Sequence, residues 1–100
     1  MFLEELLKTI KERVKKQPEG SYVASLYKEG LDSIAQKVGE EGVEVVIASK
    51  NKNRKRQISE ISDLFFHTLV LMTTLGISLK DIDNELEKRM GKRNKKIKNK

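Results

Sequence analysis

Apolar residues recur every three or four positions along most of the chain, which is the spacing of one face of an α-helix. Runs of alternating apolar and polar residues closed by Asn-Gly turns, which would indicate strands, do not occur. The pattern predicts five helices, at about 2–14, 22–29, 33–50, 57–75 and from 79 onward. The predicted fold class is therefore all-α, a bundle of four to five helices.

Residues that begin and end helices separate these segments. The expected N-caps are Ser21, Asp32 and Ser78, the last of which forms a capping-box pattern with Asp81. The expected ends are Gly30 and Gly76, together with the proline-containing stretch 17–20 and a polar turn at 51–56.

A carboxylate lies in the middle of an apolar helical segment. Residues 42–48 are apolar all round except for Glu44, and a helix of that kind is normally buried on most sides. Because burying an unpaired charge costs many kcal/mol, we expect Glu44 to be protonated, paired or metal-bound. Glu41 and Glu40 lie three and four positions before it, so the three carboxylates share one stripe of the helix.

The next helix carries a second polar stripe, formed by Glu60, Asp63 and His67 at helical spacing. No Lys or Arg lies between positions 57 and 75 to neutralise it. Because helices joined by a short turn pack antiparallel, the two acidic stripes can face each other. Carboxylate oxygens favour Mg²⁺ or Mn²⁺ over Zn²⁺. The predicted metal ligands are Glu41, Glu44, Glu60 and Asp63.

Two ordinary interpretations compete with this one. Paired acidic residues usually form a solvated helix face, as we expect at 4–5 and 85–87, but a solvated face between Val, Ile, Leu and Phe would expose a large apolar patch. His67 is either a hydrogen-bonded core histidine that orients a neighbouring carboxylate or a metal ligand.

The length and composition restrict the class of protein. A chain of 100 residues forms one domain and buries about 60–70% of its unfolded surface, so an oligomer would be the easiest way to enlarge the core. The absence of cysteine excludes disulfides, thiolate metal sites and cysteine nucleophiles. The N-terminus has acidic residues where a secretory signal needs basic ones, and no apolar run approaches membrane-spanning length. We therefore expect a soluble, cytoplasmic protein.

The net charge of +6 comes mainly from the C-terminal end. Residues 88–100 contain eight Lys or Arg and no acid, which leaves 13 basic and 15 acidic residues, a net charge of −2, in residues 1–87. We expect a domain over 1–90 and a basic tail over 91–100, most simply a solvated helix end. Nucleic-acid binding is not expected as the main function.

The acidic pattern resembles a known signature. Glu40-Glu41-x-x-Glu44 followed by Glu60-x-x-Asp63 is similar to the motif of the all-α nucleoside-triphosphate pyrophosphohydrolases, which include MazG-type proteins and dimeric dUTPases. Three further stretches, 20–30, 34–41 and 63–67, resemble the phosphoribosyl-ATP pyrophosphatase family within that group. The resemblance covers Leu3 to Arg89.

The resemblance implies hydrolysis of phosphoribosyl-ATP to phosphoribosyl-AMP and pyrophosphate in histidine biosynthesis, with Mg²⁺ as cofactor and a homodimer that completes the helix bundle. It implies that Glu41, Glu44, Glu60 and Asp63 bind the metal. Glu40 is placed to accept a proton from water, and Lys37 to reach a phosphate. The other candidate substrate-binding residues are Lys28, Ser21, Tyr22, His67 and Arg89, although Ser21 is equally a helix cap and Tyr22 a packed aromatic.

Three other functions stay open. A housekeeping nucleoside-triphosphate pyrophosphohydrolase would use the same carboxylates with a different base specificity. A carboxylate-bridged di-iron bundle would need two Glu-x-x-His pairs, and this chain has one histidine. A nucleic-acid-binding module using the basic tail would leave the carboxylates without a role.

Overall fold

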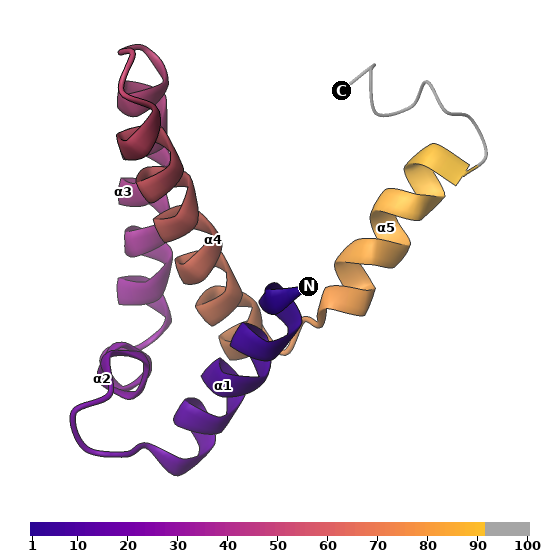
Figure 1. Ribbon diagram of the computed structural model, residues 1–100. Helices are drawn as coiled ribbons and strands as arrows, with labels where there is room; N and C mark the ends of the chain where they lie inside the picture. The colour runs from indigo at the N-terminus through magenta and orange to yellow at the C-terminus, as the bar shows by residue number, and fades with distance from the viewer. Residues whose placement is uncertain (92–100) are drawn as a thin grey trace.

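The computed structural model of the protein describes residues 1–91, and in this range the chain forms five α-helices and no strand (Figure 1). The helices are α1 (Phe2–Lys16), α2 (Tyr22–Glu29), α3 (Leu31–Ser49), α4 (Arg54–Leu75) and α5 (Leu79–Gly91). The predicted all-α class is confirmed. The basic tail expected at 91–100 lies outside the described residues except for Gly91.

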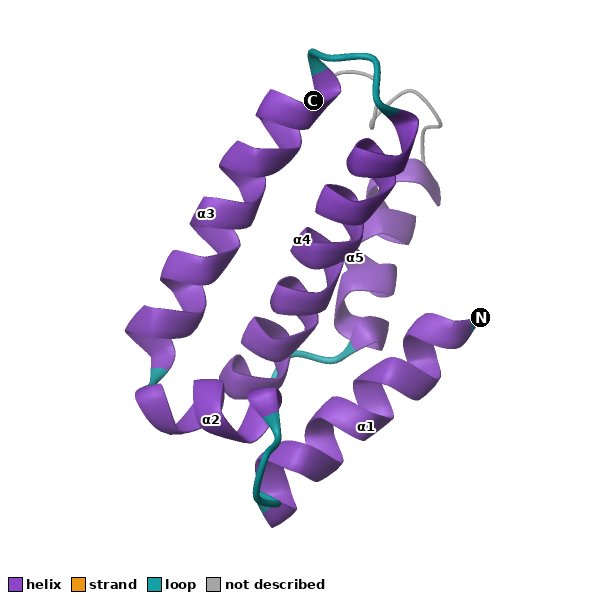
Figure 2. Ribbon diagram, turned by 60° about the vertical axis from the view of Figure 1, so that its left-hand side comes forward, coloured by secondary structure: helices purple, strands orange, loops and turns teal. Residues whose placement is uncertain are grey.

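The two longest helices, α3 and α4, run antiparallel side by side and form a hairpin (Figures 1 and 2). Gln57 holds its turn closed, because the side-chain amide donates to the backbone carbonyls of Ala48, at 3.3 Å, and Asn51, at 2.8 Å. Helices α1 and α2 cross the open end of the hairpin (Figure 2). The core lies at that end, where α1, α2, the start of α3 and the end of α4 meet. It consists of Leu7, Ile10, Val23, Leu26, Ile34, Leu69, Val70 and Met72.

The turn end of the hairpin has almost no core. Apolar side chains there are about half exposed; they are Val43, Val46, Ile47, Ile58 and Ile61. The prediction that 42–48 is buried on most sides is wrong for the single chain, in which only Ala48 of that segment is buried. The reason is that one chain offers this part of α3 a single neighbouring helix, α4, which can cover only one of its faces.

Local hydrogen bonds explain where the helices begin. Ser21 caps α2 as predicted, since its Oγ accepts from the Ala24 N–H at 3.1 Å. Helix α3 starts at Leu31, earlier than predicted, so Asp32 lies in its first turn and is not the cap. Helix α4 starts at Arg54 because Asn53 Oδ1 accepts from the Arg56 N–H at 3.0 Å. The predicted turn at 51–56 is therefore three residues too long.

The predicted capping box at the start of α5 is confirmed. The Ser78 N–H donates to Asp81 Oδ2 at 2.9 Å, and the Asp81 N–H donates to Ser78 Oγ at 3.1 Å. Gly76, with φ of 74°, ends α4 in the left-handed conformation that glycine adopts without strain. Helix α5 then extends away from the hairpin (Figure 1). An apolar groove opens between α5, α1 and α4, lined by Met1, Leu3, Phe65, Leu79, Ile82 and Leu86.

By length and composition alone, α4 is apolar enough to cross a membrane, contrary to the expectation that no segment is. This is weak support for a membrane span, because core helices of soluble proteins pass the same test. Helix α4 also carries Glu60, Asp63 and His67 and packs along α3.

Candidate metal centre

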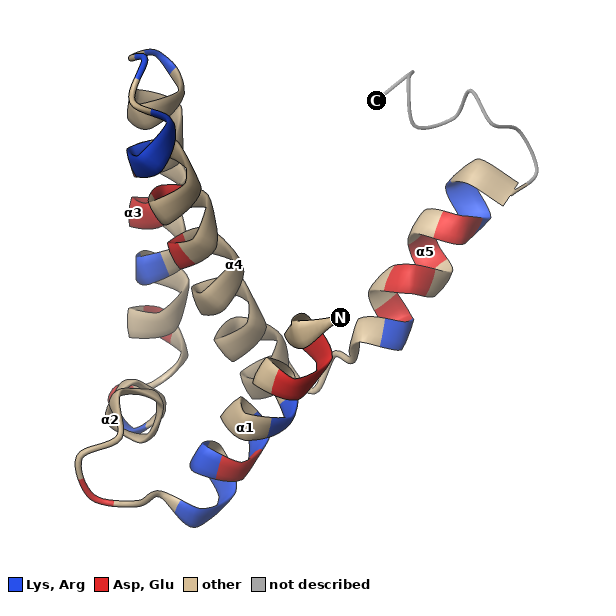
Figure 3. Ribbon diagram, in the orientation of Figure 1, with Lys and Arg blue, Asp and Glu red and all other residues tan. Residues whose placement is uncertain are grey.

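The antiparallel packing of α3 and α4 brings carboxylates from both helices together. Glu41 of α3 and Glu60 and Asp63 of α4 each offer an oxygen atom, and the three oxygens lie within 4.8 Å of one another. Acidic positions on the facing parts of α3 and α4 mark this place in Figure 3. Glu60 and Asp63 share a face because they are three residues apart in one helix. The sequence therefore predicted this convergence of three residues.

The cluster is acidic and partly shielded from water. The side chains of Glu41 and Glu60 are only 13% and 16% exposed. Two basic residues lie next to them. Lys37 Nζ is 4.0 Å from Glu41 Oε2, and Arg56 Nη2 is 3.8 Å from Glu60 Oε2. Bringing carboxylates this close costs free energy, which a cation placed between them offsets.

The three oxygens suit a small divalent cation. Glu41, Glu60 and Asp63 offer only carboxylate oxygens, which Mg²⁺ and Mn²⁺ prefer, and no soft ligand that would favour Zn²⁺.

Glu44 lies outside this group of three. Its side chain is 44% exposed, because the neighbouring Val43, Val46 and Ile47 are uncovered in the single chain, and it pairs with Arg56 at 3.5 Å. The expectation of a buried Glu44 is therefore wrong for the single chain. Of the three states expected for its carboxylate, the structure contains the paired one. Its role as a metal ligand stays a prediction.

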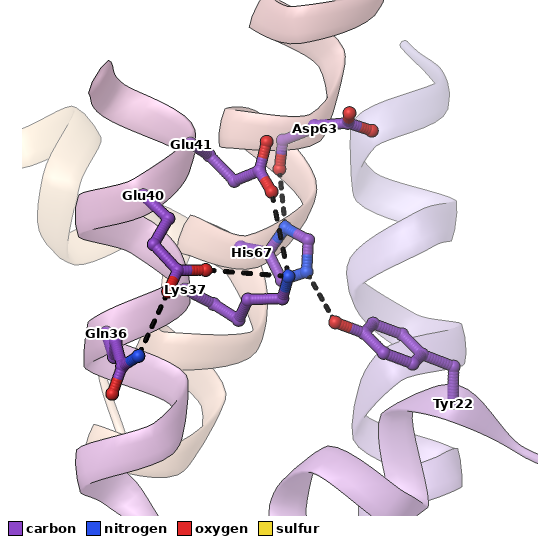
Figure 4. Close-up of polar contacts among 7 residues, drawn as sticks. All are labelled: Tyr22, Gln36, Lys37, Glu40, Glu41, Asp63 and His67. Carbon is purple, nitrogen blue, oxygen red and sulfur yellow. Dashed lines mark hydrogen bonds and ion pairs between the residues drawn. The ribbon is translucent and has the colours of Figure 1, made fainter. Parts of the chain in front are cut away.

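His67 is buried, at 6% exposure, and both of its ring nitrogens have partners (Figure 4). Nδ1 lies 2.9 Å from the backbone carbonyl of Asp63, and Nε2 lies 2.8 Å from the Tyr22 hydroxyl. A carbonyl only accepts, so Nδ1 carries the proton and Nε2 accepts from Tyr22. His67 is thus a core histidine that contacts the backbone of a candidate ligand. Its predicted part in substrate binding is untested.

Tyr22 connects this histidine to the surface beside the cluster. Its ring stacks on Phe66 with centroids 6.1 Å apart. Burial raises the pKa of the Tyr22 hydroxyl, and the negative charges of Glu41, Glu29 and Asp63 add to this, while Lys37 opposes it. The hydroxyl therefore stays protonated at neutral pH and remains a donor to His67.

A pocket of about 280 Å³ lies between α2 and α3 beside the cluster, and Tyr22, Leu26, Ser33, Gln36, Lys37 and Glu40 are among its lining residues. Glu40 lies at the rim of this pocket, where it makes one hydrogen bond and one ion pair. Gln36 Nε2 donates to Glu40 Oε2 at 3.0 Å, and Lys37 Nζ lies 3.7 Å from Glu40 Oε1 (Figure 4). Lys37 therefore contacts the cluster through Glu41 and also contacts Glu40, while the predicted role of Glu40 stays a prediction.

Two other candidate residues are not brought to the cluster by contacts in one chain. Lys28 is an exposed residue of the last turn of α2. Arg89 lies on α5, where its Nε donates to Glu85 Oε2 at 2.9 Å. Sequence reasoning missed Arg56, which contacts both Glu44 and Glu60. Its spacing of four residues before Glu60 is a helical signal, but the polar composition of 51–56 predicts a turn and hides it.

An all-α bundle that gathers carboxylates from two antiparallel helices has the architecture of proteins that bind divalent cations between helices. Comparison with known proteins narrows this class. The family model of phosphoribosyl-ATP pyrophosphohydrolase matches residues 3–90. The chain belongs to the phosphoribosyl-ATP pyrophosphohydrolase family.

Individual relatives agree with this assignment. A phosphoribosyl-ATP pyrophosphatase of Metallosphaera sedula is 52% identical over 88 residues, which cover 88% of this chain and 95% of the relative. A phosphoribosyl-ATP pyrophosphatase of Leptospira biflexa is 54% identical over 87 residues, covering 87% and 91%. A histidine biosynthesis bifunctional protein of Oceanobacillus iheyensis is 50% identical over 80 residues, which are 80% of this chain and 37% of that protein.

Proposed function

We propose that this protein hydrolyses phosphoribosyl-ATP to phosphoribosyl-AMP and pyrophosphate in histidine biosynthesis, as a soluble cytoplasmic enzyme. The observation that carries the proposal is the cluster of Glu41, Glu60 and Asp63 across α3 and α4, in a chain that belongs to this family. A triphosphate resists attack by water because its oxyanions repel the nucleophile, so a hydrolase needs a cation site of this kind.

The cofactor in this proposal is Mg²⁺, with Mn²⁺ as a substitute. Glu41, Glu60 and Asp63 would hold it, with Glu44 as a fourth ligand. When bound there, Mg²⁺ would neutralise phosphate oxygens and make a bound water more acidic.

The remaining roles belong to side chains around the cluster. Water attacks a phosphorus atom of the triphosphate, the bond to the bridging oxygen breaks, and pyrophosphate leaves. Glu40 takes the proton from the attacking water, and Lys37, between Glu40 and Glu41, contacts a phosphate oxygen. Tyr22 lines the adjacent pocket and His67 fixes its hydroxyl, so that the pocket can receive a part of the substrate outside the triphosphate.

The proposal includes a homodimer. The half-exposed apolar side chains at the turn end of the hairpin and the apolar groove between α1 and α5 need a cover, and a second copy of the chain would supply it for both.

Product analysis tests the activity. The protein is incubated with phosphoribosyl-ATP and Mg²⁺, and in parallel with the common nucleoside and deoxynucleoside triphosphates. We expect pyrophosphate and not orthophosphate, a kcat/KM for phosphoribosyl-ATP at least about 100-fold above that for any other triphosphate, and loss of activity with EDTA that added Mg²⁺ restores. A preference for another triphosphate would instead establish a general nucleotide pyrophosphohydrolase.

A further inference from the structure

Arg56 bridges two helices at the edge of the carboxylate cluster. Its Nη2 lies 3.5 Å from Glu44 Oε1 on α3 and 3.8 Å from Glu60 Oε2 on α4. Both acids are predicted metal ligands, so a guanidinium contacts the carboxylates that the proposed Mg²⁺ would need. Basic residues at the start of α4 lie beside acidic positions of both helices in Figure 3.

A divalent cation and Arg56 compete for the same negative charge. A carboxylate that binds Mg²⁺ attracts a neighbouring guanidinium less, because the ion neutralises it, and the ion and guanidinium repel each other. At 47% exposure, the Arg56 side chain is open to solvent and free to turn outward. Binding of the ion therefore weakens both ion pairs of Arg56 without trapping its charge in an apolar environment.

The released guanidinium has an obvious partner in this reaction. Arginine keeps its charge at every physiological pH, and its planar fork of donors matches two phosphate oxygens. The substrate would carry its triphosphate to the carboxylate cluster, next to which Arg56 lies. Lys37 holds the corresponding place on the α3 side, where it contacts Glu40 and Glu41.

We propose that Arg56 is a further substrate-binding residue, which pairs with Glu44 and Glu60 in the absence of a divalent cation and turns to a phosphate oxygen of the substrate when the cation binds. The inference rests on the proposed function for the identity of the substrate. The competition between Arg56 and the cation needs no substrate, so it can be tested separately.

The test compares Arg56→Gln with Lys55→Gln. Lys55 is the adjacent residue, is exposed, and points about 100° away around the helix, so its replacement removes the same charge from the same turn. Mn²⁺ binding is measured without substrate by electron paramagnetic resonance. KM and kcat for phosphoribosyl-ATP are then measured at saturating Mg²⁺.

We expect Arg56→Gln to bind Mn²⁺ about threefold to fivefold more tightly, because a competing charge is lost, and to have a KM about tenfold higher, because a charge-assisted phosphate contact is lost. Lys55→Gln should change either quantity less than about twofold. Arg56→Lys retains the charge but not the planar fork, so its Mn²⁺ affinity should match the wild type while its KM rises.

Weaker or unchanged Mn²⁺ binding by Arg56→Gln would overturn the competition, and an unchanged KM would overturn the phosphate contact. If the wild-type protein fails to hydrolyse phosphoribosyl-ATP, the proposed function falls, whereas the Mn²⁺ titration still decides whether Arg56 opposes the ion. If Arg56→Gln does not fold, as judged by circular dichroism, Arg56→Met, which also removes the charge, replaces it in both measurements with the same expected results.

Discussion

Asp63 takes part in two different interactions through two different groups. Its carboxylate belongs to the cluster with Glu41 and Glu60, and its backbone carbonyl accepts a hydrogen bond from His67. Only the carboxylate would bind a cation. A side-chain substitution at this position can therefore separate the two interactions.

We expect Asp63→Asn to release pyrophosphate at least about 100-fold more slowly, because a metal-bound phosphate gains several kcal/mol of charge stabilisation that depends on the ligands. The carbonyl contact with His67 is retained, so the melting temperature should fall little or even rise as carboxylate repulsion is relieved. Turnover of phosphoribosyl-ATP and thermal unfolding are measured together. Asp32→Asn, on an exposed first turn of α3, is the matched control. Normal turnover in Asp63→Asn would exclude this carboxylate as a ligand.

Tyr22→Phe removes the hydroxyl that donates to buried His67. We expect a loss of about 1 kcal/mol, since Nε2 of His67 is left without its protein donor, and a melting temperature about 4–8 °C lower. Tyr27→Phe, on the same helix, should have a smaller effect. Equal stability of the two variants would show that water replaces the lost bond without cost.

The same hydroxyl gives a pH dependence at alkaline pH. Burial raises the pKa of Tyr22 above 10.0, so the unfolded chain loses this proton at a lower pH than the folded protein. Stability due to Tyr22 is therefore complete below pH 10 and declines as the pH rises through the folded pKa. The free energy of unfolding, measured by chemical denaturation, should decrease less steeply above pH 10 in Tyr22→Phe than in the wild type.

At the scale of helices, the capping box of α5 stabilises the start of that helix only while Asp81 is ionised. The Ser78 backbone N–H lowers the pKa of Asp81 below 3.8, and the Ser78 hydroxyl adds to this. The contribution of the ionised cap is therefore complete above the unfolded pKa and is lost as the pH falls through the lower folded value. We expect the protection of amides in the first turn of α5, measured relative to their intrinsic exchange rates at each pH, to decrease over this acidic range. Asp81→Asn should show the decreased protection at neutral pH as well; a pH-independent protection would contradict this role.

Apolar periodicity predicted all five helices, and helical spacing predicted that Glu41, Glu60 and Asp63 converge. Sequence patterns failed where contacts between helices determine the boundary of a helix or the burial of a side chain. The start of α4 depends on the side-chain bond of Asn53, and the polar run after it fits an exposed helix as well as a turn. The burial of Glu44 depends on which surface covers Val43 and Val46, and the sequence of a single chain does not identify that surface. Arg56 was missed because the stretch 51–56 reads as a polar turn, which hides its helical spacing to Glu60.

At the scale of the whole molecule, the two ends of the hairpin differ. The end near α1 and α2 is packed, whereas the turn end keeps its apolar side chains half exposed. A single chain in this state would expose an unusually large apolar surface. The proposed dimer is therefore expected to contribute a substantial part of the stability of each subunit.

We expect light scattering to give about 23 kDa, twice the 11.5 kDa of one chain. Val46→Glu, which places a charge on the exposed apolar face, should shift the protein toward the monomer and lower its melting temperature. Ser25→Glu, an equal charge at an exposed position of α2, should leave the dimer intact. A wild-type monomer, or a dimer unaffected by Val46→Glu, would require another cover for this face.

The carboxylates of α3 and α4 lie between the packed end of the hairpin and its uncovered end. Local opening of a helix pair starts where buried contacts are few, so in a single chain the turn end of the hairpin should open first. A cation bound by Glu41 on α3 and by Glu60 and Asp63 on α4 would link the two helices and oppose this opening. Binding of a cation at the metal centre should therefore slow proteolysis at the turn between α3 and α4, which is outside the site itself.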